Sequence, residues 1–192
     1  ASYKDSCRYN LGESGMPNLR VGELLARCGE PIESLTDIVL KDHDTRGTER
    51  LRAAIAASYD GDVPIDHITA TTGTSEALFI LFSLLLEHRT SAVVPSPAFQ
   101  ALYEVPQSLG AEMRSYCLDE CNGFSPDPDD VCRLIDDTTG VVVINTPHNP
   151  SGVIAPLEAI ASVVRKADFH GAVVLADEHY RFLPIDCDYS LK

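Results

Sequence analysis

The chain has 192 residues, and its 15 lysines and arginines against 29 aspartates and glutamates give a formal net charge of −14. A chain of this length can bury one sizeable hydrophobic core without needing disulfides or metals to hold it together. The negative charge disfavours nucleic acid and anionic membranes as partners. It is compatible with a cationic substrate, and also with an acidic surface that is merely solvated.

The six cysteines form no C-x-x-C pair and no other zinc-ligand spacing, so we expect reduced thiols in a cytoplasmic protein and no metal site. Residues 1–10 are polar and do not look like a signal peptide. The most apolar stretch, residues 77–86, is too short to span a bilayer and predicts a buried helix. We therefore expect no membrane partner.

Residue patterns predict helices and strands in alternation along the chain. In chain order they predict a helix at 21–28, a helix at 49–56 capped by Thr48, a strand at 68–72, a helix at 76–87, a strand at 92–94, a helix at 95–109, a strand at 112–118, a helix at 128–135 capped by Asp127, a strand at 141–144, a helix at 157–169 and a strand at 173–176. This alternation predicts an α/β protein, a three-layer α/β/α fold with a mostly parallel sheet and right-handed crossovers.

A turn of small residues, Gly73, Thr74 and Ser75, leads from the strand at 68–72 into the next helix. Such a turn presents backbone N–H groups, hydroxyls and the positive end of the helix dipole together, which is how proteins hold a phosphate. The alternative is an ordinary helix N-cap.

Polar side chains follow the two strands richest in β-branched residues. Asn149 lies on a Pro- and Gly-containing turn after the strand at 141–144, and Asp177 and Tyr180 follow the strand at 173–176. Open α/β sheets bind ligands at the carboxyl ends of their strands. A pyridine ring that acts as an electron sink needs an anionic partner that keeps its nitrogen protonated, here Asp177. Its ring hydroxyl oxygen needs hydrogen-bond donors, which an amide and a phenol supply.

These motifs resemble those of the fold-type I, pyridoxal-phosphate-dependent class I/II aminotransferases. The family's Asn-Pro-x-Gly turn is matched by residues 149–152 and its Asp-x-x-Tyr by Asp177 to Tyr180. Its Gly-x-x-x-Leu-Arg-x-x-Ile-Ala pattern is matched by residues 47–56. The resemblance implies pyridoxal 5'-phosphate as cofactor, with its phosphate on Gly73, Thr74 and Ser75.

Phe99 occupies the position at which the family places an aromatic ring flat on the pyridine, where stacking orients the cofactor. The alternative is that this aromatic is plain core. By the resemblance Asp177, Tyr180 and Asn149 would be the catalytic residues of this chain. They would tune the cofactor for chemistry at Cα of an amino-acid substrate, through aldimine and quinonoid intermediates.

The resemblance also implies roles for acidic residues near the N-terminus. Residues 1–40 would form a segment over the active site, with Glu13 facing the substrate, although Glu13 could instead lie on a solvated surface turn. The family carries a Tyr about five residues before Gly47 that reaches the partner subunit's cofactor phosphate, and here Asp42 stands in its place. Asp42 and Asp44, beside His43, could bind a cationic substrate or could form a polar loop without chemistry.

Residues 41–192 would form part of the cofactor-binding large domain. The family's Schiff-base Lys lies further past the Asp-x-x-Tyr motif than this sequence extends, and no other Lys matches a motif position. We therefore expect the C-terminal remainder to be absent, and this chain to be inactive alone. By resemblance the complete protein would be a homodimer.

Two other functions stay open. The acidic N-terminal residues and the His in Asp177-Glu178-His179-Tyr180 resemble the capreomycidine synthase-like branch, whose members act on arginine derivatives. Carboxylates pair strongly with a guanidinium. The other alternative is an aminotransferase-like domain that binds an amino acid or the cofactor without turnover. His148 and His179 are as well explained by structural roles as by acid–base catalysis, so we assign neither a catalytic role.

Overall fold

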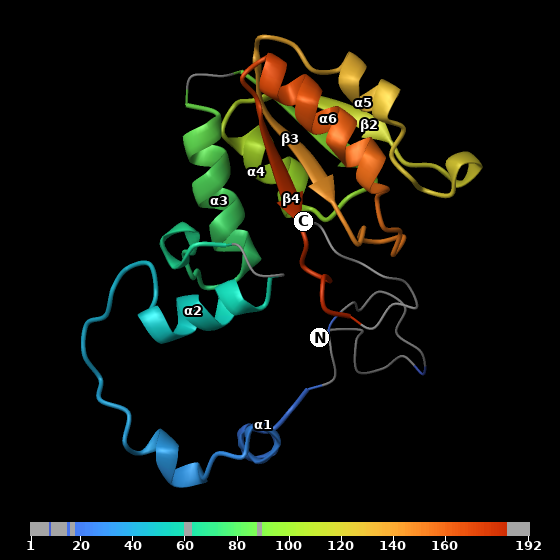
Figure 1. Cartoon of the computed structure of the whole chain (residues 1–192). Coiled ribbons are helices and arrows are strands. Elements are labelled where there is room, and N and C mark those ends of the chain that lie inside the picture. The colour runs from blue at the N-terminus through green and yellow to red at the C-terminus, as the bar shows by residue number, and fades with distance from the viewer. Residues whose placement is uncertain (1–7, 9–14, 16–17, 60–62, 88–89, 184–192) are drawn as a thin grey trace. The chain divides into compact units, whose positions relative to one another are not determined.

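A computed structural model describes residues 8, 15, 18–59, 63–87 and 90–183 of the chain, which divides into two compact units, Ala1–His43 and Asp44–Lys192. The first unit contains the helix α1 (Val21–Cys28) and the 3-10 helix η2 (Ile32–Leu35) (Figure 1). The helix predicted at 21–28 is thus confirmed. It ends at Gly29, whose φ of 69° is a left-handed conformation that glycine adopts without strain.

The second unit is built on a parallel four-stranded sheet with the strand order β2-β1-β3-β4. Its strands are β1 (Ser91–Ser96), β2 (Glu112–Cys117), β3 (Thr139–Asn145) and β4 (Val173–Asp177). Its helices are α2 (Glu49–Ala57), α3 (Thr74–Leu85), α4 (Ala101–Ser108), α5 (Pro128–Arg133) and α6 (Leu157–Phe169), with the 3-10 helices η3 (Ile65–His67) and η4 (Glu120–Asn122). All seven residues of β3 are buried, as expected for a central parallel strand covered on both faces.

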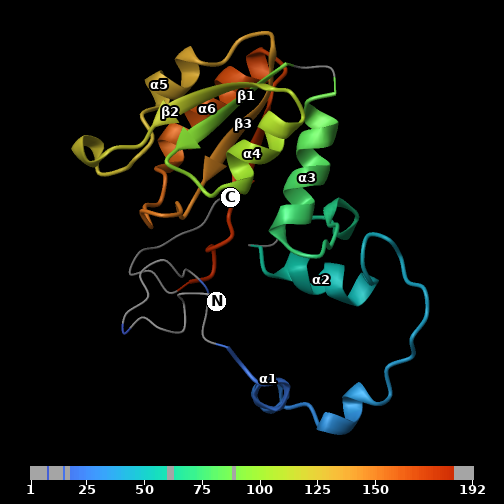
Figure 2. The same ribbon diagram turned by 180° about the vertical axis from the view of Figure 1, so that it is seen from behind.

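Helices cover both faces of this sheet, so the predicted three-layer α/β/α fold is confirmed (Figures 1 and 2). Alternate residues of a strand point to opposite faces. Val93 and Val142 therefore pack in the cluster with α5 and α6, whereas Val94 and Val143 pack in the cluster with α3 and α4. Phe82 of α3 is fully buried in the second cluster.

The prediction of a strand at Ile68–Thr72 is wrong. This segment pairs with no strand within the described residues, and one of its backbone groups, Ala70 N–H, instead donates to Arg46 O at 2.8 Å. A β-branched sequence favours extended backbone, but a strand also needs a neighbour that accepts its hydrogen bonds.

Two predicted helix starts also shift. Helix α3 begins at Thr74 rather than Glu76, so Thr74 and Ser75 lie in its first turn and Gly73 is the N-cap. Helix α4 begins at Ala101, after a loop at 97–100. Residues that precede a proline are biased away from helical backbone, which accounts for the extended backbone of Val94 and Ser96 before Pro95 and Pro97; α4 itself accommodates Pro106.

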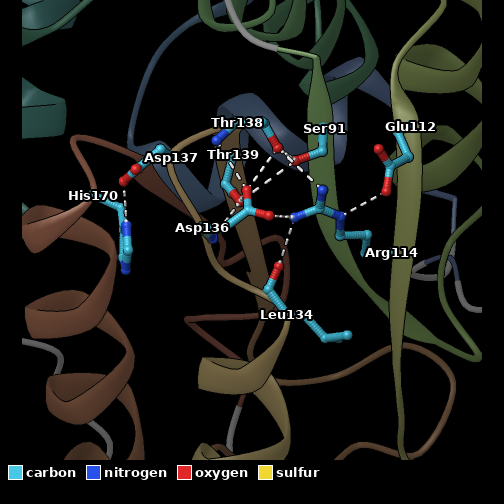
Figure 3. Close-up of polar contacts among 9 residues, drawn as sticks. All are labelled: Ser91, Glu112, Arg114, Leu134, Asp136, Asp137, Thr138, Thr139 and His170. Atoms are coloured by element: carbon cyan, nitrogen blue, oxygen red, sulfur yellow. Dashed lines mark hydrogen bonds and ion pairs between the residues drawn. The ribbon is translucent and has the colours of Figure 1, made fainter.

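The amino ends of β1, β2 and β3 are joined by a polar network around Arg114 (Figure 3). The Arg114 guanidinium donates to Glu112 Oε1 at 2.8 Å and to Leu134 O at 3.1 Å, and it lies 2.8 Å from Asp136 Oδ2. The hydrogen bond from Arg114 holds the pKa of Asp136 well below its usual range. This network lies at the edge of the sheet opposite to the one where parallel sheets bind ligands, so we assign it a structural role.

No helix in the described ranges is long and apolar enough to cross a membrane. Within the same ranges, no cluster of His, Cys, Asp and Glu side chains could hold a metal ion.

Candidate functional site

The carboxyl ends of β3 and β4 are tied together by Asn145, the last residue of β3, which is 6% exposed. Its Nδ2 donates to Asp177 O at 3.0 Å, and its Oδ1 accepts from the backbone N–H of Asn149 at 2.7 Å. Thr146 N–H also donates to Asp177 O, at 2.9 Å. One side chain therefore fixes the turn that carries Asn149 against the end of β4 that carries Asp177.

Asp177 places a buried carboxyl at this edge of the sheet. The residue is 6% exposed, and its Oδ1 accepts a hydrogen bond from His179 N–H at 3.2 Å. Burial raises the pKa of Asp177, and the His179 N–H opposes this. No Lys or Arg from the described part of the chain forms an ion pair with Asp177. A protonated ring nitrogen would supply the missing cation, so this carboxyl fits the nitrogen end of a pyridine cofactor.

The amino end of α3 lies beside the turn that follows β4, because Thr74 Oγ1 and His179 Nδ1 are 3.3 Å apart. Gly73 has a φ of 89°, which disfavours any residue with a side chain. Where the chain is described, no side chain caps this end of α3, and the Glu76 carboxylate accepts instead from Thr72 N–H. The N–H groups of the first turn thus suit the predicted phosphate contact of Gly73, Thr74 and Ser75.

Phe99 lies in the loop between β1 and α4 and is 39% exposed. This exposure speaks against the alternative that the ring is plain core. The loop is linked to the turn of Asn149 through His148, whose Nε2 lies 2.9 Å from Pro97 O. Hydrogen bonds therefore connect, directly or through one neighbour, the elements that carry Phe99, Asn149, Asp177 and Thr74.

Tyr180 is half-buried, and its ring makes an edge-on contact with the ring of His179 at 4.7 Å between centroids. The turn that carries it is anchored by Arg181, a residue that no sequence motif singles out. Its Nη1 donates to both carboxylate oxygens of Glu178, at 3.0 and 2.9 Å, and its guanidinium lies 4.6 Å from the ring centroid of Tyr59 after α2.

Three further residues were predicted to bind substrate. The carboxylate of Asp44 accepts from Arg46 N–H at 2.9 Å and lies 3.7 Å from Arg52 Nη2. The Arg46 N–H, foremost, lowers the pKa of Asp44. These contacts favour the alternative of a polar loop for Asp44. Asp42 belongs to the first unit, and Glu13 lies outside the described residues.

The glycine and arginine of the 47–56 motif have structural roles in this chain. A Cβ on Gly47, whose φ is 92°, would lie only 2.8 Å from the Cβ of Ala70. Arg52 is 5% exposed, and its guanidinium donates to Gly47 O and Ile65 O. Together they hold the amino end of α2 against the segment that leads to Gly73.

A cavity of about 410 Å³ lies beside the Pro97–Ala98 loop, against the carboxyl end of β1, the middle of β2 and α4. Its lining includes Ser96, Tyr103 and Ser115 but none of Asn149, Asp177 and Tyr180. Asn149, Asp177 and Tyr180 instead follow β3 and β4, on the other side of β1 from this cavity.

Residues 39–188 match the profile of the family described as aminotransferase class I and II, and the chain belongs to this family. It is 38% identical to capreomycidine synthase of Streptomyces vinaceus over 148 residues, which are 74% of this chain and 37% of that protein. The structure of aspartate aminotransferase from Thermus thermophilus with maleate superimposes with a TM-score of 0.73 at 28% identity, over 79% of this chain and 41% of that one.

A PLP-dependent cyclase, OrfR, superimposes equally well. The TM-score is 0.73 at 29% identity, over 85% of this chain and 43% of that chain. This chain therefore spans about two fifths of the length of the relatives described.

Proposed function

We propose that the chain is the cofactor-binding part of a pyridoxal-phosphate-dependent enzyme that acts at Cα of an amino-acid substrate. The observation that supports this most is the buried Asp177 carboxyl, which forms no ion pair with a Lys or Arg among the described residues and is linked through His179 to the uncapped amino end of α3. A site with an anion at one end and free N–H donors at the other suits a cationic ring that carries a phosphate. Membership of the aminotransferase family supports the same cofactor.

The residues of this chain would each contact a different part of the cofactor. Asp177 holds a proton on the ring nitrogen, which stabilises negative charge that develops during chemistry at Cα. The Asn149 amide and the Tyr180 hydroxyl donate to the ring oxygen, and Phe99 covers one face. The cofactor, when bound, supplies the electron sink. Gly73, Thr74 and Ser75 receive the phosphate.

Binding of pyridoxamine 5'-phosphate by the chain, measured calorimetrically, tests this proposal. This form carries an amine instead of an aldehyde, so it forms no imine with surface lysines. We expect it to bind at least tenfold more tightly than pyridoxamine or inorganic phosphate, because only the complete molecule reaches both ends of the site. Ser75→Ala should weaken binding, whereas Ser108→Ala, on the exposed end of α4, should not. The proposal is overturned if pyridoxamine 5'-phosphate does not bind, or if pyridoxamine or inorganic phosphate binds as tightly as it does.

A second candidate is a cyclase that acts on an arginine derivative. The identity of 38% to capreomycidine synthase and the likeness to the OrfR cyclase favour it. The Asp44 carboxylate already accepts a hydrogen bond from Arg46 N–H and lies near the Arg52 guanidinium. Asp42 and Glu13 would therefore be the carboxylates that pair with the substrate guanidinium. Guanidino amino acids, and not aspartate, should then change the absorption spectrum of the complete protein loaded with pyridoxal phosphate. A response to aspartate alone would exclude this candidate.

A non-catalytic binding domain is the third candidate. It would bind pyridoxamine 5'-phosphate, while the complete protein loaded with pyridoxal phosphate would leave every amino acid unchanged in a product assay. For the complete protein we propose a homodimer in the cytoplasm, to be checked by light scattering and by cell fractionation.

A further inference from the structure

His148 is buried between two loops that carry predicted cofactor contacts. It follows β3, it is 4% exposed, and its ring makes two hydrogen bonds. Nε2 lies 2.9 Å from Pro97 O in the loop after β1, and Nδ1 lies 2.7 Å from Ser151 Oγ in its own loop. The ring therefore bridges the ends of two neighbouring strands.

The partners of His148 define its protonation. The Pro97 carbonyl can only accept, so Nε2 carries a hydrogen. In the neutral ring Nδ1 then accepts from the Ser151 hydroxyl, whose oxygen accepts in turn from Val153 N–H at 3.3 Å. Burial lowers the pKa of His148, although the Pro97 carbonyl opposes this, which agrees with a neutral ring. The polar atoms of the ring and of Ser151 thus all have partners.

The backbone alone does not hold these two loops together. Pairing between β1 and β3 covers Ser91 to Val93 and ends at Val93 and Val142, although β1 continues to Ser96 and β3 to Asn145. Beyond that point the hydrogen bond from His148 to Pro97 joins the segments that follow β1 and β3. Pro97 is two residues from Phe99, and His148 directly precedes Asn149.

We propose that His148 is a positioning residue that sets the position of the Phe99 ring relative to the Asn149 amide, and so aligns the surface on which the cofactor ring stacks with the donor to its ring oxygen. This inference rests on the proposed cofactor function. A buried histidine that only stabilises the fold would make the same hydrogen bonds, so the test must separate fold stability from cofactor geometry.

A double-mutant cycle makes this separation. Calorimetric titration with pyridoxamine 5'-phosphate compares the wild-type chain, His148→Leu, Phe99→Ala and the double variant, with unfolding by urea recorded for each. If His148 acts through Phe99, His148→Leu weakens binding about tenfold in the wild-type background and less than about twofold in the Phe99→Ala background. His148→Gln keeps a donor toward Pro97 and should recover most of the affinity.

His170 provides the matched control. It is also bonded through Nδ1 to a side-chain oxygen, Asp137 Oδ1 at 2.7 Å, but it follows α6 at the other edge of the sheet (Figure 3). His170→Leu should lower stability without changing cofactor affinity.

If His148→Leu also lowers only stability, or if its effect on affinity is equal in both Phe99 backgrounds, the inference is overturned while the cofactor function stands. If the wild-type chain does not bind pyridoxamine 5'-phosphate, both the inference on His148 and the proposed cofactor function are overturned. Should His148→Leu not fold, Ser151→Ala, which removes the Nδ1 partner together with the acceptor of Val153 N–H, must show the same dependence on Phe99.

Discussion

The substitution Asp177→Asn removes the negative charge at the end of β4 but keeps the size of the side chain. Asp177 is 6% exposed and accepts one hydrogen bond from His179 N–H. Within the described part of the chain no Lys or Arg forms an ion pair with it, and the charge of the neighbouring His179 offsets the effect of burial on its pKa only in part. A ring nitrogen that binds here in its protonated form would therefore face a desolvated carboxylate.

The size of the effect follows from this burial. Truncating one partner of a buried, hydrogen-bonded charge pair costs about 2–5 kcal/mol, which is a loss of roughly 30-fold to several thousand-fold in affinity. The pH dependence has a defined sign as well. Because burial raises the pKa of Asp177, its carboxylate takes up a proton at a higher pH than an ordinary aspartate does. Wild-type affinity should fall as the pH is lowered through that raised pKa, and Asp177→Asn should lack this component.

Calorimetric titration with pyridoxamine 5'-phosphate over a series of pH values measures both effects. Asp168→Asn is the control, because Asp168 is an exposed aspartate on α6. Asp177 does not pair with the ring nitrogen if Asp177→Asn binds within about twofold of wild type, or if both variants lose the same affinity.

Three substitutions test the supporting structure. Gly73→Ala should lower the free energy of unfolding by about 1–2 kcal/mol in urea, because Gly73 has a φ of 89°, and should weaken phosphate binding; Gly22→Ala, in α1, should be neutral or stabilising. Tyr116→Phe removes a hydroxyl that donates to Val143 O at 2.8 Å in the core and should cost about 1–3 kcal/mol in urea unfolding; an unchanged midpoint would contradict this. The Asp136 pKa is lowered in the folded state, so the stability this carboxylate contributes is present above its unfolded pKa and is lost as the pH falls through the folded pKa. Asp136→Asn should therefore be less stable at neutral pH and lose less stability on acidification, as followed by thermal unfolding from pH 7 to 2, a range that extends well below the unfolded pKa.

Local sequence patterns predict much of this fold. The runs of valine at 141–143 and 173–174 identify β3 and β4, and the helix at 157–169 is predicted to the residue. Thr48 and Asp127 accept hydrogen bonds from Leu51 N–H and Asp129 N–H and thus cap α2 and α5 as expected. Such features depend on neighbours in the sequence, so they can be seen in it.

Contacts between distant residues could not be predicted in this way. The bridge that Asn145 makes between Asn149 and Asp177 depends on β3 lying next to β4 in a particular register. The stacking of Arg181 on Tyr59 joins parts of the chain with no common pattern. The segment at 68–72 has the residues of a strand but lacks a strand neighbour in the described structure, which only the three-dimensional arrangement reveals.

The central claim is that Asp177 keeps a bound pyridine nitrogen protonated. Nitrogen-15 NMR of pyridoxamine 5'-phosphate, labelled at the ring nitrogen and bound to the chain, measures this directly. We predict the chemical shift of a protonated ring at neutral pH with the wild-type chain, and that of an unprotonated ring with Asp177→Asn. An unprotonated ring on the wild-type chain, or the same shift with both chains, would contradict the claim.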